Sequence, residues 1–309
     1  MRRSIVIIAA LLAGFAAQAQ TTPEEFKARY DKHIRAVGAC GVGIETIIDR
    51  WEEAFPDDPQ VYEARSSFYL SKSASHSIIT RDTKRYLGKE AVLSLKDSTG
   101  TDVYYFEDTV CEDSLFALSQ TAIDKAIGLE PNELEHRINK ISALLLYEKE
   151  SPDMTTQELL KLIDYQKSSS PEWTYRGLAV DEDTFKQSMQ EYCYQLFQNA
   201  TPGNYEAFKT VSEAMLKLYP KDSNCMNNLG SYWMVYRKNN KKALSWYKKA
   251  LKVNPKDYSA AKNCVILARK EKNLRLEKKY LPSLIESTPS ESERIACQVR
   301  LENLEKKKK

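Results

Sequence analysis

The stretch from Met226 to Pro255 spaces small, aromatic and helix-stopping residues in a way that favours one kind of packing. Gly230 and Ala243 are small, so two helices can approach each other closely at these positions. Trp233 and Tyr247 are large enough to fill the groove beside that contact. The closing proline then stops the second helix. The pattern therefore predicts a pair of tightly packed antiparallel helices.

The closing proline recurs along the chain, each time after a run whose apolar residues repeat with helical spacing. These prolines are Pro56, Pro131, Pro220, Pro255 and Pro289. The last two intervals are 35 and 34 residues, which indicates repeated units that each pack on their neighbours. The same spacing predicts thirteen helices between Pro23 and Lys306.

This pattern resembles the tetratricopeptide repeat, a family of helix pairs stacked into a superhelix. The residues that carry the resemblance are Met226, at the usual Trp position, Leu229, Gly230, Trp233, at the usual Tyr position, Ala243, Tyr247, Ala250 and Pro255. The resemblance implies an all-α fold, an α–α superhelix of about six helix pairs, in a single domain over residues 20–309.

Within that domain, residues 224–255 match the repeat best. Residues 256–289 form a degenerate unit, because Pro282 falls inside its second helix and predicts a kink or a late start. The highly charged residues 290–306 follow Ser290, a favourable N-cap, and predict a solvating capping helix. The loop around Arg237 to Asn240 is one residue longer than the norm of about 34 per repeat, and we expect this surface loop to absorb it.

Residues 90–108 break the helical pattern. Two runs of strand-forming residues flank Asp97-Ser98-Thr99-Gly100, four residues that favour a turn. They predict a β-hairpin inserted between repeat helices, with an irregular loop as the alternative. A second interruption, the loop from Ser168 to Val180, supplies most of the excess length between Pro131 and Pro220.

The first nineteen residues have the features of a secretory signal peptide. Arg2 and Arg3 precede an apolar run from Ile5 to Ala17, and Ala17-Gln18-Ala19 is a cleavage site of the small-x-small type. The run is shorter than the roughly 20 residues that span a membrane, and no Cys near the cleavage site could carry a lipid. We therefore predict export to the periplasm, cleavage after Ala19 and no stable membrane anchor.

Charge is distributed unevenly along the chain. Between Asp97 and Glu135 ten acidic residues face one base, and between Arg237 and Lys279 fifteen bases face three acids. The basic segment favours an anionic partner. Because the signal peptide directs the chain out of the cytoplasm, nucleic acid is not expected to be that partner.

No constellation of residues predicts catalysis, a cofactor or a metal. Gly38 to Gly43 is glycine-rich but follows a helical pattern and lacks the Lys-Ser/Thr of a phosphate loop. His33, His76 and His136 have no metal-ligand spacing. The six cysteines are dispersed, which favours free core thiols, with one or two long-range disulfides as the alternative.

The resemblance also implies a binding groove lined by the first helix of each pair, which in this family takes an extended peptide or a partner helix. The groove positions that can be mapped are Asn227, Asn228, Ser231, Met234, Lys262, Asn263, Arg269 and Lys270. Asn228 and Asn263 match positions where relatives bond a peptide backbone. A complete carboxylate clamp is not expected, since the next unit offers Glu293 and Cys297.

We therefore expect a non-catalytic protein-interaction scaffold, and the sequence leaves its oligomeric state open. The alternative function is glycan binding within a polysaccharide uptake system, suggested by eighteen Tyr and four Trp. Most of these aromatic residues fall at core spacing. Trp173 and Tyr175, in the second interrupting loop, are the candidates for exposed ligand contacts.

Overall fold

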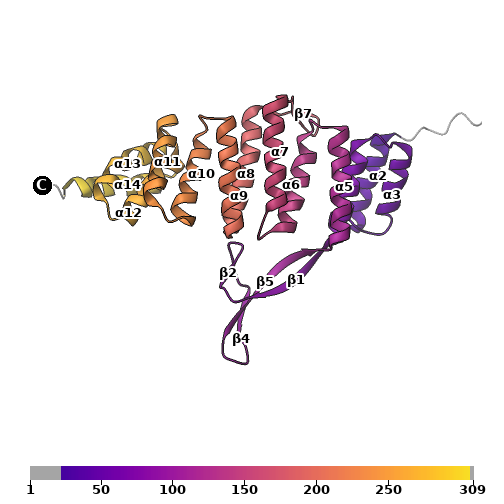
Figure 1. Cartoon of the computed structure of the whole chain (residues 1–309), viewed down its shortest axis with the longest axis horizontal. Helices are drawn as coiled ribbons and strands as arrows, with labels where there is room; N and C mark the ends of the chain where they lie inside the picture. Colours follow the sequence, from indigo (N-terminus) through magenta and orange to yellow (C-terminus); the bar gives the residue numbers. More distant parts are fainter. Residues whose placement is uncertain (1–21, 307–309) are drawn as a thin grey trace, which may run out of the picture. The chain divides into compact units, whose positions relative to one another are not determined.

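The computed structural model describes residues 22–306, and in this part of the chain thirteen α-helices follow one another (Figure 1). They are α2 (Pro23–Val37), α3 (Ile44–Ala54), α4 (Pro59–Ser73), α5 (Asp113–Leu129), α6 (Leu134–Glu148), α7 (Asp153–Ser169), α8 (Glu182–Asn199), α9 (Pro202–Leu218), α10 (Ser223–Ser231), α11 (Asn240–Val253), α12 (Tyr258–Lys270), α13 (Leu274–Ser287) and α14 (Glu291–Lys306). The predicted signal peptide lies outside the described residues. The prediction of a helical fold interrupted by β-structure is confirmed.

The chain divides into two compact units. The first unit contains the residues up to Ser77 and the segment Thr109–Lys140, and the second contains Ile78–Asp108 and the residues from Ile141 onward. Both units are built from helices that pack against their neighbours in sequence.

Helix starts are set by local chemistry. The side chains of Asp58, Thr201, Asp222 and Asp257 accept hydrogen bonds from backbone N–H groups in the first turns of α4, α9, α10 and α12. These N–H groups have no partner inside a helix, so each cap stabilises a start that the sequence marks.

The core of the first unit is aromatic and aliphatic. Trp51 of α3 is buried among Ile44, Ile48 and Phe26, and its indole N–H donates to Asp58 Oδ2 at 2.8 Å. Helices α4 and α5 pack against each other although residues 74–112 separate them. The Ser66 and Ser119 hydroxyls, buried between these two helices, lie 3.0 Å apart.

The segment between α4 and α5 is a β-arm. Its strands are β1 (Ala74–Arg81), β2 (Arg85–Tyr86), β3 (Lys89–Glu90), β4 (Leu93–Lys96) and β5 (Asp102–Cys111). A three-stranded sheet has the order β1-β5-β4, and β2 pairs with β3 (Figure 1). The predicted hairpin is the antiparallel pair β4 and β5, and the insertion is longer than residues 90–108 because β1 and the β2–β3 hairpin belong to it.

Helices α10 and α11 in the second unit show why the repeat pattern needs a glycine. A Cβ atom at Gly230 would lie 2.3 Å from Cε1 of Tyr247, so only glycine lets the two helices approach this closely. Tyr247 and Ala243 are fully buried there. The predicted register of this helix pair is therefore confirmed.

The extra residue of this repeat is not absorbed by a surface loop. Residues Tyr232–Tyr236 form a π-helical turn at the end of α10, and the Arg237 N–H donates to Tyr232 O, five residues back, at 3.2 Å. A π-helical turn accommodates one residue more than an α-helical turn. Since α11 already begins at Asn240, the extra residue lies in the π-helical turn and not in the loop before α11.

The last three helices cover the residues that sequence analysis assigned to a degenerate unit and a capping helix. Pro282 lies inside α13, which begins at Leu274, so the alternative of a late helix start is wrong. The Ser290 hydroxyl accepts a hydrogen bond from Glu293 N at 3.3 Å and caps α14, as predicted. Cys264 occupies the core position that the repeat gives to a buried Leu, and its side chain is fully buried.

Candidate partner-binding face

The first helices of successive pairs in the second unit are joined by polar side chains. Asn228 of α10 and Gln190 of α8 exchange two amide hydrogen bonds of 2.9 and 3.1 Å. Asn263 of α12 donates to Asn227 Oδ1 at 3.0 Å. Lys262 Nζ lies 3.1 Å from Glu293 Oε1 of α14. We call these six residues the polar ladder, and the surface that carries them the first-helix face.

The polar ladder repeats with the 35-residue spacing of the sequence. Asn227 and Lys262 both reach toward the following first helix, while Asn228 and Asn263 both reach back toward the preceding one. Each helix is therefore fixed to both neighbours by adjacent residues. Hydrogen-bonded side chains of this kind set the register of helix packing.

Asn228 makes its bonds within the protein. Its side chain is 5 % exposed, and both its amide N and its amide O are bonded to Gln190. Two further predicted groove residues lie around the hydroxyl of Tyr247. The Ser231 hydroxyl is 3.4 Å from it, and Met234 Sδ accepts from it at 3.8 Å.

Arg269 belongs to a charged cluster with a buried carboxylate. Glu277 of α13 is 1 % exposed and accepts hydrogen bonds from Arg269 Nε at 2.7 Å and from Arg300 of α14 at 2.7 and 3.0 Å. Arg300, and then Arg269, hold the pKa of this carboxyl below its ordinary value. The cluster ties together the last three helices.

Neighbouring groups favour the charged forms of both Lys262 and Glu293. Hydrogen bonds from Thr288, and then from Tyr258 and Lys262, lower the pKa of Glu293. The Tyr258 hydroxyl and Glu293 raise the pKa of Lys262. Lys270, in contrast, is exposed and forms no ion pair within residues 22–306. It is the predicted groove cation whose charge stays uncompensated.

Sequence analysis missed Gln190, Glu277 and Arg300 as partners of the predicted groove residues. Gln190 precedes Asn228 by 38 residues rather than 35, so the repeat interval alone does not find it. Glu277 lies in a second helix, outside the positions expected to line a groove. A search for residues able to compensate Arg269 would have pointed to Glu277, one of only three acids in the basic segment.

The expectation that Trp173 is exposed is wrong. Its side chain is 4 % exposed, stacks on Phe185 with the ring centroids 5.9 Å apart, and donates from the indole N–H to Gln166. The loop folds into a small hairpin of β6 (Thr174–Tyr175) and β7 (Leu178–Ala179), which leaves Tyr175 36 % exposed. The loop therefore offers no Trp platform for a sugar.

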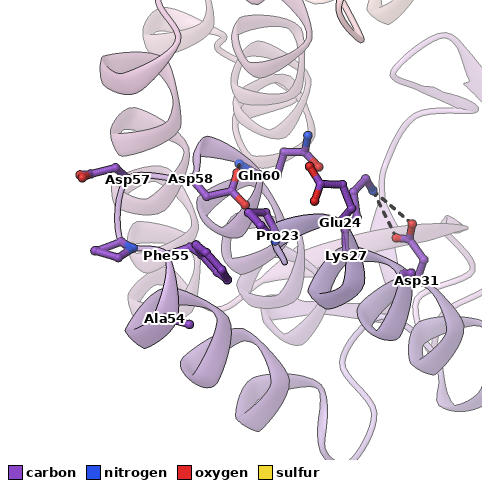
Figure 2. A pocket seen from close by; sticks show the side chains of 11 residues that line it. Pro23, Glu24, Lys27, Asp31, Ala54, Phe55, Asp57, Asp58 and Gln60 are labelled. Atoms are coloured by element: carbon purple, nitrogen blue, oxygen red, sulfur yellow. Dashed lines mark hydrogen bonds and ion pairs between the residues drawn. The ribbon is translucent and has the colours of Figure 1, made fainter. Parts of the chain in front are cut away.

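An open pocket of about 750 Å³ lies in the first unit, at residues that sequence analysis did not single out. Figure 2 shows its lining side chains, which come from α2, from the turn between α3 and α4, and from the adjoining ends of those two helices. Four carboxylates and Lys27 surround the rim, and Lys27 pairs with Asp31 at 3.2 Å. Its chemistry is that of an acidic surface hollow beside Phe55 and two prolines.

Among the described residues no group of three or more His, Cys, Asp or Glu side chains has the arrangement of a metal site. His136 is buried between Glu63 and Glu130, with ring nitrogens 3.5 and 3.3 Å from their carboxylates. The His33 ring bonds to Val42 O at 2.8 Å. In the part of the chain that the structure covers, no helix is both long and apolar enough to cross a bilayer.

No family model matches the chain. No curated protein matches it either. Among the solved structures that match is one described as the functional characterization of Pseudomonas aeruginosa pilF, with a TM-score of 0.39 and 16 % identity over 62 % of this chain and 77 % of that one.

Proposed function

We propose that this protein is a non-catalytic interaction scaffold of the periplasm, which binds a protein partner on its first-helix face. The partner enters as an extended peptide or as a helix and lies along α10 and α12. Helical repeats of this type commonly present such faces to peptides and helices.

The observation that carries the proposal is an exposed stripe on α12. Ser259, Ile266 and Lys270 are exposed and Lys262 and Asn263 are half-buried, and together they follow the i, i+3, i+4, i+7, i+11 spacing of one helix face. Ile266 is 42 % exposed in the middle of this stripe. An apolar side chain flanked by an uncompensated lysine suits a segment that carries an apolar residue next to an acidic one.

The test is site-specific cross-linking in the periplasm of the native cell. A photoreactive amino acid at Ile266 is compared with the same group at Val253 of α11, which is 40 % exposed and lies on a second helix. We expect one discrete product from position 266 and none from position 253. Lys270→Glu should reduce that product several-fold by charge repulsion. Equal products from both positions would move the binding face elsewhere.

Periplasmic location is part of the proposal and has its own test. Intact-mass measurement of the protein from the native envelope should give a chain that starts at Gln20. A pool that retains Met1 would contradict export with cleavage.

A further inference from the structure

Strand β4 has an unpaired outer edge. In the sheet order β1-β5-β4 it is a terminal strand, and all four of its residues, Leu93 to Lys96, are exposed. Edge strands template pairing with other chains unless charges, prolines or bulges block them. Here the edge carries one charge, Lys96, and no proline, and a β-bulge lies at its start, where the Val92 N–H donates to the carbonyl of Tyr105, the residue opposite Leu93.

The backbone groups that face outward can be identified. Leu93 lies opposite Tyr105 and Leu95 opposite Val103, and the Asp97 N–H donates to Thr101 O at 2.9 Å. Because inward and outward backbone groups alternate along an antiparallel strand, the odd-numbered residues bond to β5. The N–H and C=O groups of Ser94 and Lys96 therefore point away from the sheet.

The edge is preorganised by a tight turn. Asp97 Oδ1 accepts hydrogen bonds from the backbone N–H groups of Thr99 and Thr101 at 2.8 and 3.0 Å, and Gly100 takes the positive φ of 82° that the turn needs. These bonds lower the pKa of the Asp97 carboxyl, with the Thr99 hydroxyl contributing most. An edge that is already ordered loses little entropy on pairing.

The arm is also anchored where it meets the helices of the second unit. Glu150, at the turn between α6 and α7, accepts hydrogen bonds from Arg81 at 2.8 Å and from the Tyr86 hydroxyl at 2.9 Å. Lys149 forms an ion pair with Asp108 of β5. The β4 edge is therefore presented on a fixed support.

The exposed side chains of β4 are apolar on one face. Leu93 and Leu95 share that face and are 50 % and 49 % exposed. Isolated exposed leucines are ordinary, but two that alternate along an unpaired strand edge form a cross-strand pairing surface. An occupant should cover both leucines and bond to Ser94 and Lys96.

A second copy of the same strand covers both leucines and pairs Ser94 with Ser94 in one register, in which Lys96 lies opposite Val92, whose N–H already donates to Tyr105 O. Antiparallel pairing must bring outward-facing residues opposite each other, which leaves three symmetric arrangements. Lys96 opposite Lys96 sets like charges together. The arrangement with Ser94 opposite Lys96 is unfavourable because it places the apolar Leu93 opposite the charged Asp97. Ser94 opposite Ser94 places Leu93 opposite Leu95 twice and keeps the two lysines apart.

We propose that β4 pairs with β4 of a second copy of this chain, antiparallel and centred on Ser94, so that two arms join in one continuous sheet. Such pairing uses the same patch on both copies, as the isologous interface of a two-fold dimer does. The interface lies on the arm and uses none of the residues on the first-helix face. The dimer proposal can therefore be tested independently of the proposed function.

Cysteine cross-linking tests the register. In a Cys40→Ser background, which removes the exposed native thiol, Ser94→Cys and Lys96→Cys are oxidised with copper phenanthroline. Paired Ser94 residues should have Cα atoms about 5.5 Å apart, within disulfide range. The two Lys96 residues should be displaced by four positions, about 13 Å, beyond that range. We expect a covalent dimer from position 94 alone. Dimers from position 96, or none from 94, overturn the proposal.

Sedimentation equilibrium of the full chain tests the association without cross-linking. Leu95→Lys should raise the dimer dissociation constant roughly tenfold or more, because each dimer contains the altered pair twice. The matched control is Leu274→Lys, on α13, since Leu274 is also 49 % exposed. It should leave the constant unchanged. A wild-type chain that remains monomeric up to about 0.1 mM, where weak dimers form, contradicts the proposal.

Discussion

At the scale of single residues, Glu277 of the second unit is a buried carboxylate held by two arginines. Its buried carboxylate is bonded by Arg300 and Arg269, which lower its pKa in the folded chain. A lowered folded-state pKa stabilises the fold above the unfolded value, here 4.5, and this stabilisation is lost as pH falls through the folded value.

Glu277→Gln should therefore destabilise the protein at pH 7 and matter progressively less below about pH 4.5. We expect a loss of about 1 to 2 kcal/mol at pH 7, because both arginines reach solvent, which screens the pair. Urea unfolding of both proteins at pH 7 and pH 4 measures the difference in their free energies of unfolding. The control is Glu286→Gln, an exposed carboxylate of the same helix, which should change stability by less than about 0.5 kcal/mol.

Gly230 gives a second prediction at this scale. A Cβ there would overlap the Tyr247 ring, so Gly230→Ala should cost about 1 to 3 kcal/mol and Gly230→Leu more. The control is Gly128→Ala in α5, where no atom lies within 4 Å of an added Cβ and the alanine should stabilise the helix slightly. Thermal unfolding compares the variants. Similar midpoints for both alanine variants would refute the packing argument.

At the scale of elements, the β-arm is an insertion between two helices, α4 and α5, that pack directly against each other. The Glu112 N–H donates to Ser73 O at 3.0 Å, so the two ends of the insertion meet at the helix ends. Closing the gap with a short linker costs little entropy compared with a long one.

Replacing residues 75–110 by a short Gly/Ser turn should therefore leave the helices intact. We expect the circular dichroism signal per helical residue to stay unchanged. We also expect a single cooperative unfolding transition. The same variant should be monomeric if the arm is the dimer interface. Loss of cooperative unfolding would show that the arm is required for the helical fold.

At the scale of the whole molecule, charge should govern how fast an anionic partner is captured. The segment from Arg237 to Lys279 has a net charge of +12, and Lys248, Lys249 and Lys252 are exposed on α11. Exposed charges attract at long range only where salt does not screen them. The screening length falls from about 30 Å at 0.01 M salt to about 8 Å at 0.15 M.

Changing these three lysines to Gln should slow association with the partner cross-linked from Ile266 by about three- to tenfold at low salt. Near 0.15 M salt the difference should shrink, and dissociation should change little at either salt concentration. Stopped-flow association rates against salt concentration provide the measurement. Identical salt slopes for both proteins would leave the three lysines as a solvated helix face.

The repeat pattern determined which residues pack between helices. Gly230, Ala243 and Tyr247 could be assigned from the sequence because residue size and helical spacing leave one way to bury them. The thirteen helices and the β4–β5 turn followed from equally local signals, namely caps, prolines and turn residues.

Tertiary structure decided where the polar side chains point. From the sequence, the Asn228 side chain could bind a partner or a neighbouring helix. In the structure it bonds to Gln190, 38 residues earlier in the chain. Trp173 is buried because its ring stacks on Phe185 and its indole N–H donates to Gln166. The extra residue of the repeat is accommodated in a π-helical turn. Hydrophobic periodicity specifies which face of a helix is buried. The bonds of a polar residue depend on groups that only the folded chain brings within about 3 Å.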